Sequence, residues 1–194
     1  MSTLSNVIFA PDPPSERHRG RIFLIDFGLS KYYRDPTTLV HILEGTTRAE
    51  RGTQDYASIH NHLHITSSRR DDMESLAYTM VKLLRGSHPW VHAELPSDCL
   101  RLKREWSGPS LCVDYPSVFG EFVDYTRALE FDEDPQYSSW KERFRALVPG
   151  MPSDSLYDVN VRRLSEGLTR SSPVRVWPTA YTRFAKWSCM ASFS

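Results

Sequence analysis

One stretch of the chain holds residue types that carry out chemistry in other proteins. His60, His62 and His64 alternate along the sequence, and three imidazoles at alternate positions can bind a metal if the segment is a strand. Ser58 with a nearby histidine is a minimal nucleophile–base pair, but no Gly-x-Ser-x-Gly turn surrounds it. The alternative is a loop in which these side chains have structural roles.

A second candidate is Asp26-Phe27-Gly28, which directly follows the apolar run Ile22–Ile25. Taken alone, the tripeptide indicates a strand that ends in an Asp-x-Gly turn. A long loop and then a helix with acidic residues at its start follow it. That order is found in protein kinases, where the aspartate holds the Mg²⁺ that bridges the ATP phosphates.

The elements that must position these residues are mostly helical. Apolar residues recur at helical spacing from Asp71 to Leu84, Ser68 and Asp71 suggest a cap, and Gly86 ends the run. Residues 30–66 and 91–115 show no firm period. The pattern predicts the following elements: strands at 7–9 and 22–25, and helices at 71–84, 116–129 and 139–148.

Composition excludes several classes of protein. Hydrophobic residues make up 40% of the 194 residues, which favours one modest core over a disordered chain. The 24 basic and 24 acidic residues cancel, which disfavours a basic nucleic-acid binder and an acidic tail protein. The three cysteines show no Cys-x-x-Cys spacing, and no segment resembles a signal peptide or a membrane span. We expect an intracellular protein, cytoplasmic or nuclear, with no nucleic-acid or membrane partner.

The sequence between residues 5 and 148 resembles the casein kinase 1 family of Ser/Thr protein kinases. The run Ser68-Arg69-Arg70-Asp71-Asp72-Met73-Glu74-Ser75-Leu76 is the most specific match, and Ser58-Ile59 stands where most kinases have Ala-Pro-Glu. The other matching segments follow in family order: Ile22–Asp35, Gly52-Thr53, Tyr56–Ile59, Pro89-Trp90, Tyr115–Ser117, Arg127–Leu129 and Phe131-Asp132.

The resemblance implies a mainly α fold: a kinase-like C-lobe with one small β-hairpin and an irregular activation segment. Residues 1–148 would be a partial kinase domain, from the end of the catalytic loop onward. Residues 149–194 match nothing and lack a clear period, so we expect a poorly ordered extension there. Its aromatic residues could alternatively form a docking face.

The resemblance also implies a cofactor site. Asp26 and Asn6 would be Mg²⁺ ligands, and Phe27 and Gly28 would complete the segment that meets ATP. Asp72 resembles the helix aspartate that receives hydrogen bonds from the catalytic-loop backbone. Thr53 resembles the activation-segment threonine near the substrate, and Asp72 and Thr53 would therefore support catalysis rather than perform it.

Other kinase residues are missing from these 194 residues. Counting back five positions from Asn6 puts the catalytic aspartate at Met1, and no Gly-rich loop, strand lysine or paired glutamate of an N-terminal lobe is present. We therefore assign no catalytic residue. Asp55 stands where the family often has an arginine that binds a priming phosphate, so we expect no dependence on such a phosphate unless neighbouring basic residues supply the anion site. Those neighbours are Arg101, Lys103 and Arg104.

The function implied by the resemblance is ATP-dependent phosphorylation of protein Ser or Thr. We expect weak or absent binding of ATP and Mg²⁺ by these 194 residues and no activity of this chain alone. The expected partner is a protein substrate or ligand on the C-lobe face. Apolar surface near Val7–Phe9 and Phe27, where an N-lobe would sit, would favour self-association. The alternatives are a non-catalytic kinase-like binding module and an inactive remnant.

Overall fold

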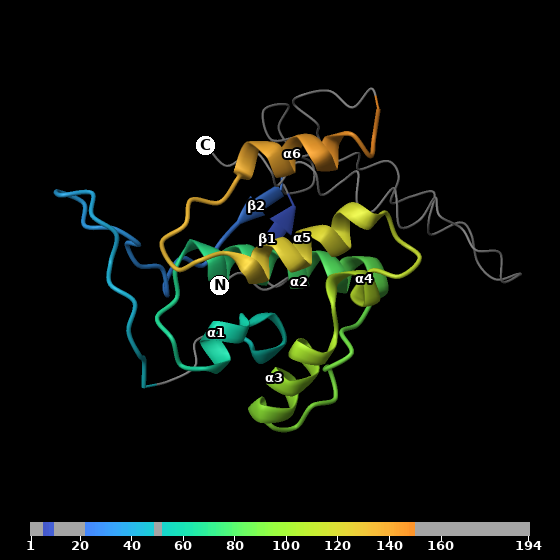
Figure 1. The fold of residues 1–194 in the computed structure, drawn as a ribbon, viewed down its shortest axis with the longest axis horizontal. Coiled ribbons are helices and arrows are strands. Elements are labelled where there is room, and N and C mark those ends of the chain that lie inside the picture. Colours follow the sequence, from blue (N-terminus) through green and yellow to red (C-terminus); the bar gives the residue numbers. More distant parts are fainter. Residues whose placement is uncertain (1–5, 10–21, 49–51, 150–194) are drawn as a thin grey trace, which may run out of the picture. The chain divides into compact units, whose positions relative to one another are not determined.

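The computed structural model describes residues 6–9, 22–48 and 52–149, and these ranges are mainly helical (Figure 1). They hold six α-helices and one two-stranded antiparallel sheet, as the sequence predicts for a mainly α fold. The chain divides into two compact units. Among the described residues, one unit comprises Asn6 and residues 26–48 and 52–136, and the other comprises residues 7–9, 22–25 and 137–149. The expected disorder of the extension concerns residues 150–194, which lie outside the described residues.

Among the residues that the structure describes, the unit that contains the strands has three elements. β1 (Val7–Phe9) pairs with β2 (Ile22–Leu24) in antiparallel register, with Ile8 opposite Phe23. This confirms both predicted strands. α6 (Tyr137–Arg145) begins two residues earlier than predicted and ends three residues earlier.

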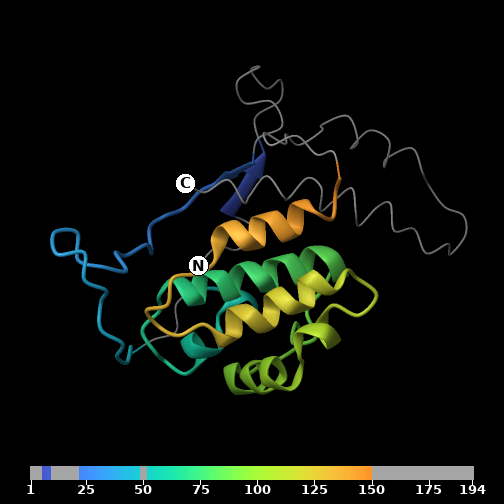
Figure 2. The ribbon, with the colours of Figure 1, turned by 45° about the horizontal axis from the view of Figure 1, so that its top comes forward.

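The larger unit is built around a pair of helices, α2 (Arg69–Arg85) and α5 (Ser117–Ala128), which run side by side (Figures 1 and 2). The helices are antiparallel, because contacts link the opposite ends of the pair. The Tyr115 hydroxyl just before α5 donates to the carbonyl of Leu84 near the end of α2, at 2.7 Å. The apolar residues buried in this unit include Met73, Ala77, Tyr78, Met80, Val81, Val118, Phe119, Phe122 and Val123.

Local signals fix the ends of α2 as the sequence predicts. The Asp71 carboxylate accepts a hydrogen bond from the backbone N–H of Ser68 at 2.7 Å, as the third residue of a capping box does. At the other end, Gly86 has φ of 84°, a left-handed conformation that glycine adopts without steric cost.

A short helix lies against α5 at very close range. α4 (Gly108–Leu111) approaches so closely that a Cβ built on Gly108 would lie 2.0 Å from the carbonyl oxygen of Gly120. The Asp124 carboxylate accepts the N–H of Gly108 at 2.7 Å. Only glycine fits at this crossing.

The structure adds helices that the sequence did not predict. α3 (Pro96–Glu105) and α4 lie in residues 91–115, where we expected no regular element. The predicted loop of residues 30–66 contains a 3₁₀ turn at Gln54–Tyr56 and α1 (Ile59–His62). α3 escaped detection because its two buried residues are Cys99 and Lys103, which do not form an apolar stripe.

Candidate functional site

The Asp26-Phe27-Gly28 segment forms a tight turn directly after the second strand. Asp26 has φ of 63°, and its carboxylate accepts the backbone N–H of Gly28 at 3.3 Å. Such a local hydrogen bond is how aspartate tolerates the left-handed region. Ser30 N–H then donates to the Phe27 carbonyl at 2.9 Å. The predicted Asp-x-Gly turn is therefore present, and it leaves the Asp26 side chain exposed.

The other predicted site residues lie on separate elements. Asn6 is half-buried immediately before β1, and Thr53 is exposed at the start of the 3₁₀ turn. The carbonyl of Thr53 accepts the N–H of Tyr56 at 3.0 Å. That Asn6 and Asp26 share a magnesium ion stays a prediction. So does the supporting role of Thr53.

Asp72 lies on a polar groove of about 360 Å³ at the start of α2. Surrounding protein atoms disfavour its charged form and raise its pKa, although the side chain still reaches solvent. Hydroxyl and amide side chains make up much of the lining. The residues around the groove are Leu29, Ser30, Lys31, Tyr33, Thr47, Asn61, Thr66, Ser67, Ser68, Arg69 and Asp72.

The segment that leads from the Asp-Phe-Gly turn into this groove folds back on itself at residues 33–42, which we call the 33–42 hairpin. Its ends pair through Ile42 N–H and the Tyr33 carbonyl at 2.9 Å. At the tip, the Asp35 carboxylate accepts the N–H groups of Thr37 and Thr38, at 2.8 and 2.7 Å. These hydrogen bonds, the one from Thr38 first, lower the pKa of Asp35. The apolar side chains of Phe27 and Leu29, in and beside the Asp-Phe-Gly turn, are exposed. Leu39 at the tip of the hairpin is exposed as well.

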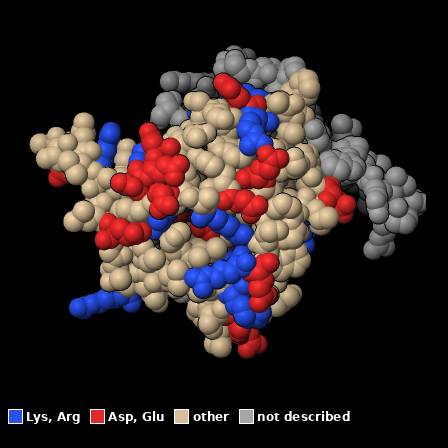
Figure 3. All heavy atoms as spheres, viewed as in Figure 1, with Lys and Arg blue, Asp and Glu red and all other residues tan. Residues whose placement is uncertain are grey.

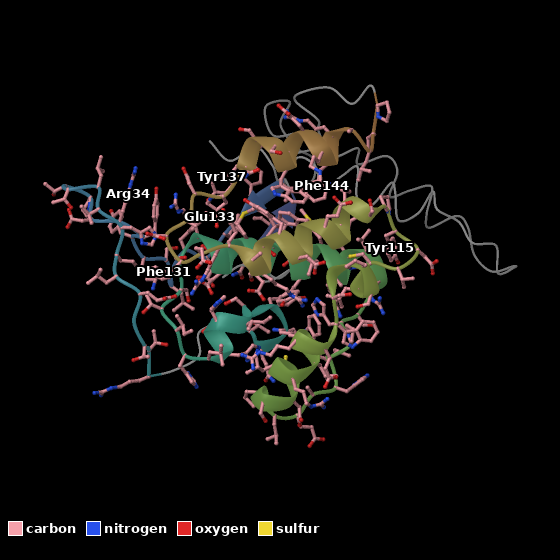
Figure 4. The ribbon with its side chains drawn as sticks, viewed as in Figure 1. Arg34, Tyr115, Phe131, Glu133, Tyr137 and Phe144 are labelled. Atoms are coloured by element: carbon pink, nitrogen blue, oxygen red, sulfur yellow. The ribbon has the colours of Figure 1, made fainter. Side chains whose placement is uncertain are left out.

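Two consecutive arginines in the first turn of α2 contact the start of the 33–42 hairpin and the segment that follows it. The Arg69 guanidinium lies over the Tyr33 ring at 4.4 Å, and it also donates to Asp134 at 2.5 Å. Arg70, almost fully buried, donates to the Glu44 carboxylate at 2.6 Å. Figure 4 labels Arg34 on the hairpin and Phe131 on the segment after α5.

A buried polar network joins α1, α2 and α5. The Glu74 carboxylate accepts the Tyr78 hydroxyl at 2.5 Å and the Ile59 N–H at 3.0 Å. Arg127 donates to the same Tyr78 oxygen at 3.1 and 3.2 Å, and to the Trp106 carbonyl at 2.6 Å. Burial raises the pKa of Glu74 and holds that of Tyr78 well above its usual value. The network therefore braces the helices, with Arg127 supplying the positive charge.

The alternating histidines do not form a strand, so the geometry that a metal site there required is absent. His60 and His62 lie on α1, and His64 follows it with φ of 58°. Ser58 caps α1, accepting the N–H of Asn61 at 3.0 Å, and its hydroxyl donates to Asp71. Within the described ranges, no three His, Cys, Asp or Glu side chains gather to hold a metal ion.

Sequence reasoning did not predict where Lys103 lies. Lys103 is fully buried on α3, with its ammonium 3.1 Å from His62 Nε2. This corrects the expectation that Lys103 could help to supply a surface anion site. Arg104 is exposed, and Arg101 pairs with Glu105 at 2.8 Å. The sequence around Lys103 gives no sign of its burial, because its hydrogen-bond partners lie more than forty positions away in the chain.

The surface is mixed in charge. Figure 3 shows acidic and basic side chains interspersed over the face in view, in keeping with the zero net charge of the chain. In the described ranges, no helix is both long and apolar enough to cross a bilayer.

The fold and the site together define a mainly helical domain in which a buried helix carries the Arg-Arg-Asp-Asp run and an Asp-Phe-Gly turn follows a strand. No family model matches the chain. Casein kinase I homolog 2 of Schizosaccharomyces pombe is 36% identical to it over an alignment of 167 residues, and the match covers 82% of this chain. The chain belongs to the casein kinase I family, and it spans 38% of the length of that yeast relative.

Proposed function

We propose that this chain forms the C-lobe of a casein kinase I-type protein Ser/Thr kinase and presents a protein substrate for phosphorylation by ATP. The observation that carries the proposal is the 36% identity over 167 residues to casein kinase I homolog 2. The antiparallel α2–α5 pair, the braced segment at Ser58-Ile59 and the Asp-Phe-Gly turn after β2 support it.

The residues near the strands fit a magnesium site in their chemistry. Asp26 offers an exposed carboxylate and Asn6 an amide oxygen, and both are hard oxygen ligands of the kind that Mg²⁺ takes together with substrate phosphates. Mg²⁺–ATP, when bound, supplies the phosphoryl group and neutralises charge that develops on it. In this proposal Asp26 and Asn6 hold the metal, while Thr53 and Asp72 orient the substrate side.

These 194 residues contain no Gly-rich loop over the phosphates and no aspartate at the position of the catalytic base. Positioning supplies most of kinase catalysis, and a general base typically contributes about 10²–10⁴-fold. We therefore infer that a polypeptide of residues 1–194 binds a peptide substrate but transfers no phosphate by itself. The second candidate, a non-catalytic binding module, uses the same polar groove without chemistry.

The test measures peptide binding and phosphate transfer separately. The chain is incubated with labelled ATP, Mg²⁺ and Ser/Thr peptides. Two variants are tested beside it: Asp26→Ala and, as a half-exposed control on α3, Asp98→Ala. We expect peptide binding by fluorescence anisotropy with a dissociation constant in the micromolar range, and no transfer above background. Transfer that Asp26→Ala abolishes and Asp98→Ala preserves would overturn the inferred inactivity.

Absence of peptide binding would overturn the substrate-presenting role. Ser67→Glu places a charge on the groove and is expected to weaken binding about tenfold, whereas Ser110→Glu, outside the groove on α4, is expected to leave it unchanged.

A further inference from the structure

The ammonium of Lys103 is enclosed by acceptors on every side. Its Nζ donates to the carbonyls of Gln54 at 2.8 Å and Ala57 at 2.7 Å, and lies 3.1 Å from Nε2 of His62. An ammonium has three donors and no acceptor, so these three partners satisfy it completely. The bond to His62 requires Nε2 to be the unprotonated ring nitrogen.

Two aromatic rings also lie close to the same ammonium. Nζ lies 4.9 Å from the centre of the Tyr78 ring and 5.3 Å from that of Trp90. Rings placed in this way attract a cation through their quadrupoles. Burial disfavours the charged form and lowers the pKa of Lys103 to about 8, and Cys99, Glu74 and Asp55 oppose that shift.

The two carbonyls held by Lys103 belong to the first residue of the 3₁₀ turn at Gln54–Tyr56 and to the residue that follows the turn. Within the turn, the Asp55 carbonyl accepts the Trp90 indole N–H at 3.0 Å. Tyr56 and Ala57 are buried, whereas Thr53 at the start of the turn is exposed. One ammonium therefore ties both ends of the turn that carries Asp55 to α3.

We propose that Lys103 is a positioning residue whose buried ammonium acts as an internal cation, fixing the turn at Gln54–Tyr56 for the incoming substrate instead of binding a phosphate at the surface. The exposed Thr53 and Asp55 then determine which substrate binds. The Asp55 carboxylate disfavours a phosphorylated peptide. That consequence for the substrate rests on the proposed function, but the fixing of the turn does not.

The first experiment measures amide hydrogen exchange in the turn. Lys103→Met keeps the length of the side chain and removes the three donors, and Arg104→Met changes the exposed neighbour on the same helix. We expect the amides of Tyr56 and Ala57 to exchange at least about tenfold faster in Lys103→Met and at the wild-type rate in Arg104→Met. Equal exchange in the wild type and Lys103→Met would overturn the proposal.

A rescue experiment separates the cation from simple packing. In Lys103→Ala, added ethylammonium is expected to restore slow exchange of the same amides, and ethanol at the same concentration is not. Equal restoration by both compounds, or by neither, would show that the positive charge does not hold the turn.

A measurement on the wild-type chain does not depend on how the variants fold. Amine acetylation followed by mass spectrometry is expected to modify Lys103 at least about tenfold more slowly than the exposed Lys31. Modification of both at one rate would overturn the buried position.

The surface role predicts different results. If Lys103 bound phosphate, Lys103→Met would weaken binding of a phosphorylated peptide relative to its unphosphorylated match and would leave exchange in the turn unchanged. Because exchange and acetylation need neither ATP nor phosphate transfer, the positioning proposal and the proposed function can fail independently.

Discussion

A buried histidine makes the stability of this protein depend on pH below neutrality. His88 is almost inaccessible, its Nε2 donates to the carbonyl of Tyr78 at 2.7 Å, and its ring stacks on Trp90 at 4.9 Å. No hydrogen-bond partner is found for its Nδ1 among the described residues. Burial lowers the pKa of His88 from 6.5 to about 4.

The sign of the effect follows from proton binding. In the unfolded chain this histidine takes up its proton near pH 6.5, whereas in the folded protein it stays neutral down to about pH 4. Between these values the unfolded state binds more protons, so the stability contributed by neutral His88 is complete above pH 6.5 and is lost as the pH falls through that window. At about 1.4 kcal/mol per pH unit, the full loss is about 3 kcal/mol.

The assay is urea denaturation at a series of pH values from about 7 to about 4. His88→Gln keeps an N–H for the Tyr78 carbonyl but does not titrate, and His92→Gln replaces an exposed histidine nearby. We expect wild type and His92→Gln to lose about 3 kcal/mol more across this range than His88→Gln loses. The buried Glu74 has a raised pKa and acts in the opposite direction, but it contributes equally to all three proteins. Parallel pH profiles for wild type and His88→Gln would refute the reasoning.

Three further substitutions test other parts of the molecule. Gly120→Ala places a Cβ 2.9 Å from the Gly108 backbone, and we expect a loss of about 1–3 kcal/mol in the free energy of unfolding, measured by urea denaturation. Arg127→Met removes both bonds to the Tyr78 hydroxyl, and we expect a loss of about 2–3 kcal/mol by the same assay. Asp55→Arg replaces a carboxylate with a phosphate-binding group, and we expect about tenfold tighter binding of a phosphorylated peptide relative to its unphosphorylated match, measured by anisotropy.

Each substitution has a matched control. Gly45→Ala meets only the Thr66 hydroxyl at 3.6 Å and should cost little. Arg104→Met changes an exposed residue of α3 and should leave stability unchanged. Asp98→Arg changes a half-exposed residue of the same helix, outside the turn, and should leave the peptide preference unchanged. The explanations fail if a control matches its test variant, or if Asp55→Arg leaves the preference for the two peptides unaltered.

The helices that the sequence predicted are those whose apolar residues face the interior at regular spacing. α2 and α5 have such a stripe, and Gly86 marks the end of α2. α3 buries Cys99 and Lys103, and the burial of a lysine depends on carbonyls supplied by a turn more than forty residues earlier in the chain. The spacing of apolar residues along one helix gives no information about such a distant partner.

In the candidate site, too, features set by neighbouring residues were predicted and contacts between distant residues were not. The turn at Asp26 was predicted because aspartate and glycine punctuate a strand locally. The contacts of Glu74 with Tyr78 and Ile59 were not, because a carboxylate in an amphipathic helix is ordinarily placed on its solvated side. His62 was a candidate metal ligand only under a strand interpretation, and its partner proves to be Lys103.

The two arginines that begin α2 have a consequence for how the chain withstands cleavage. Side chains of consecutive helical residues diverge by about 100°, so Arg69 and Arg70 hold Tyr33 and Glu44 separately, on either side of the exposed hairpin tip. A protease that cuts the tip would leave Tyr33 on one fragment and Glu44 with both arginines on the other. The cut end at Tyr33 would keep its contacts with Arg69 and with Ile42, while Arg70 and Glu44 would hold the other side of the tip in place.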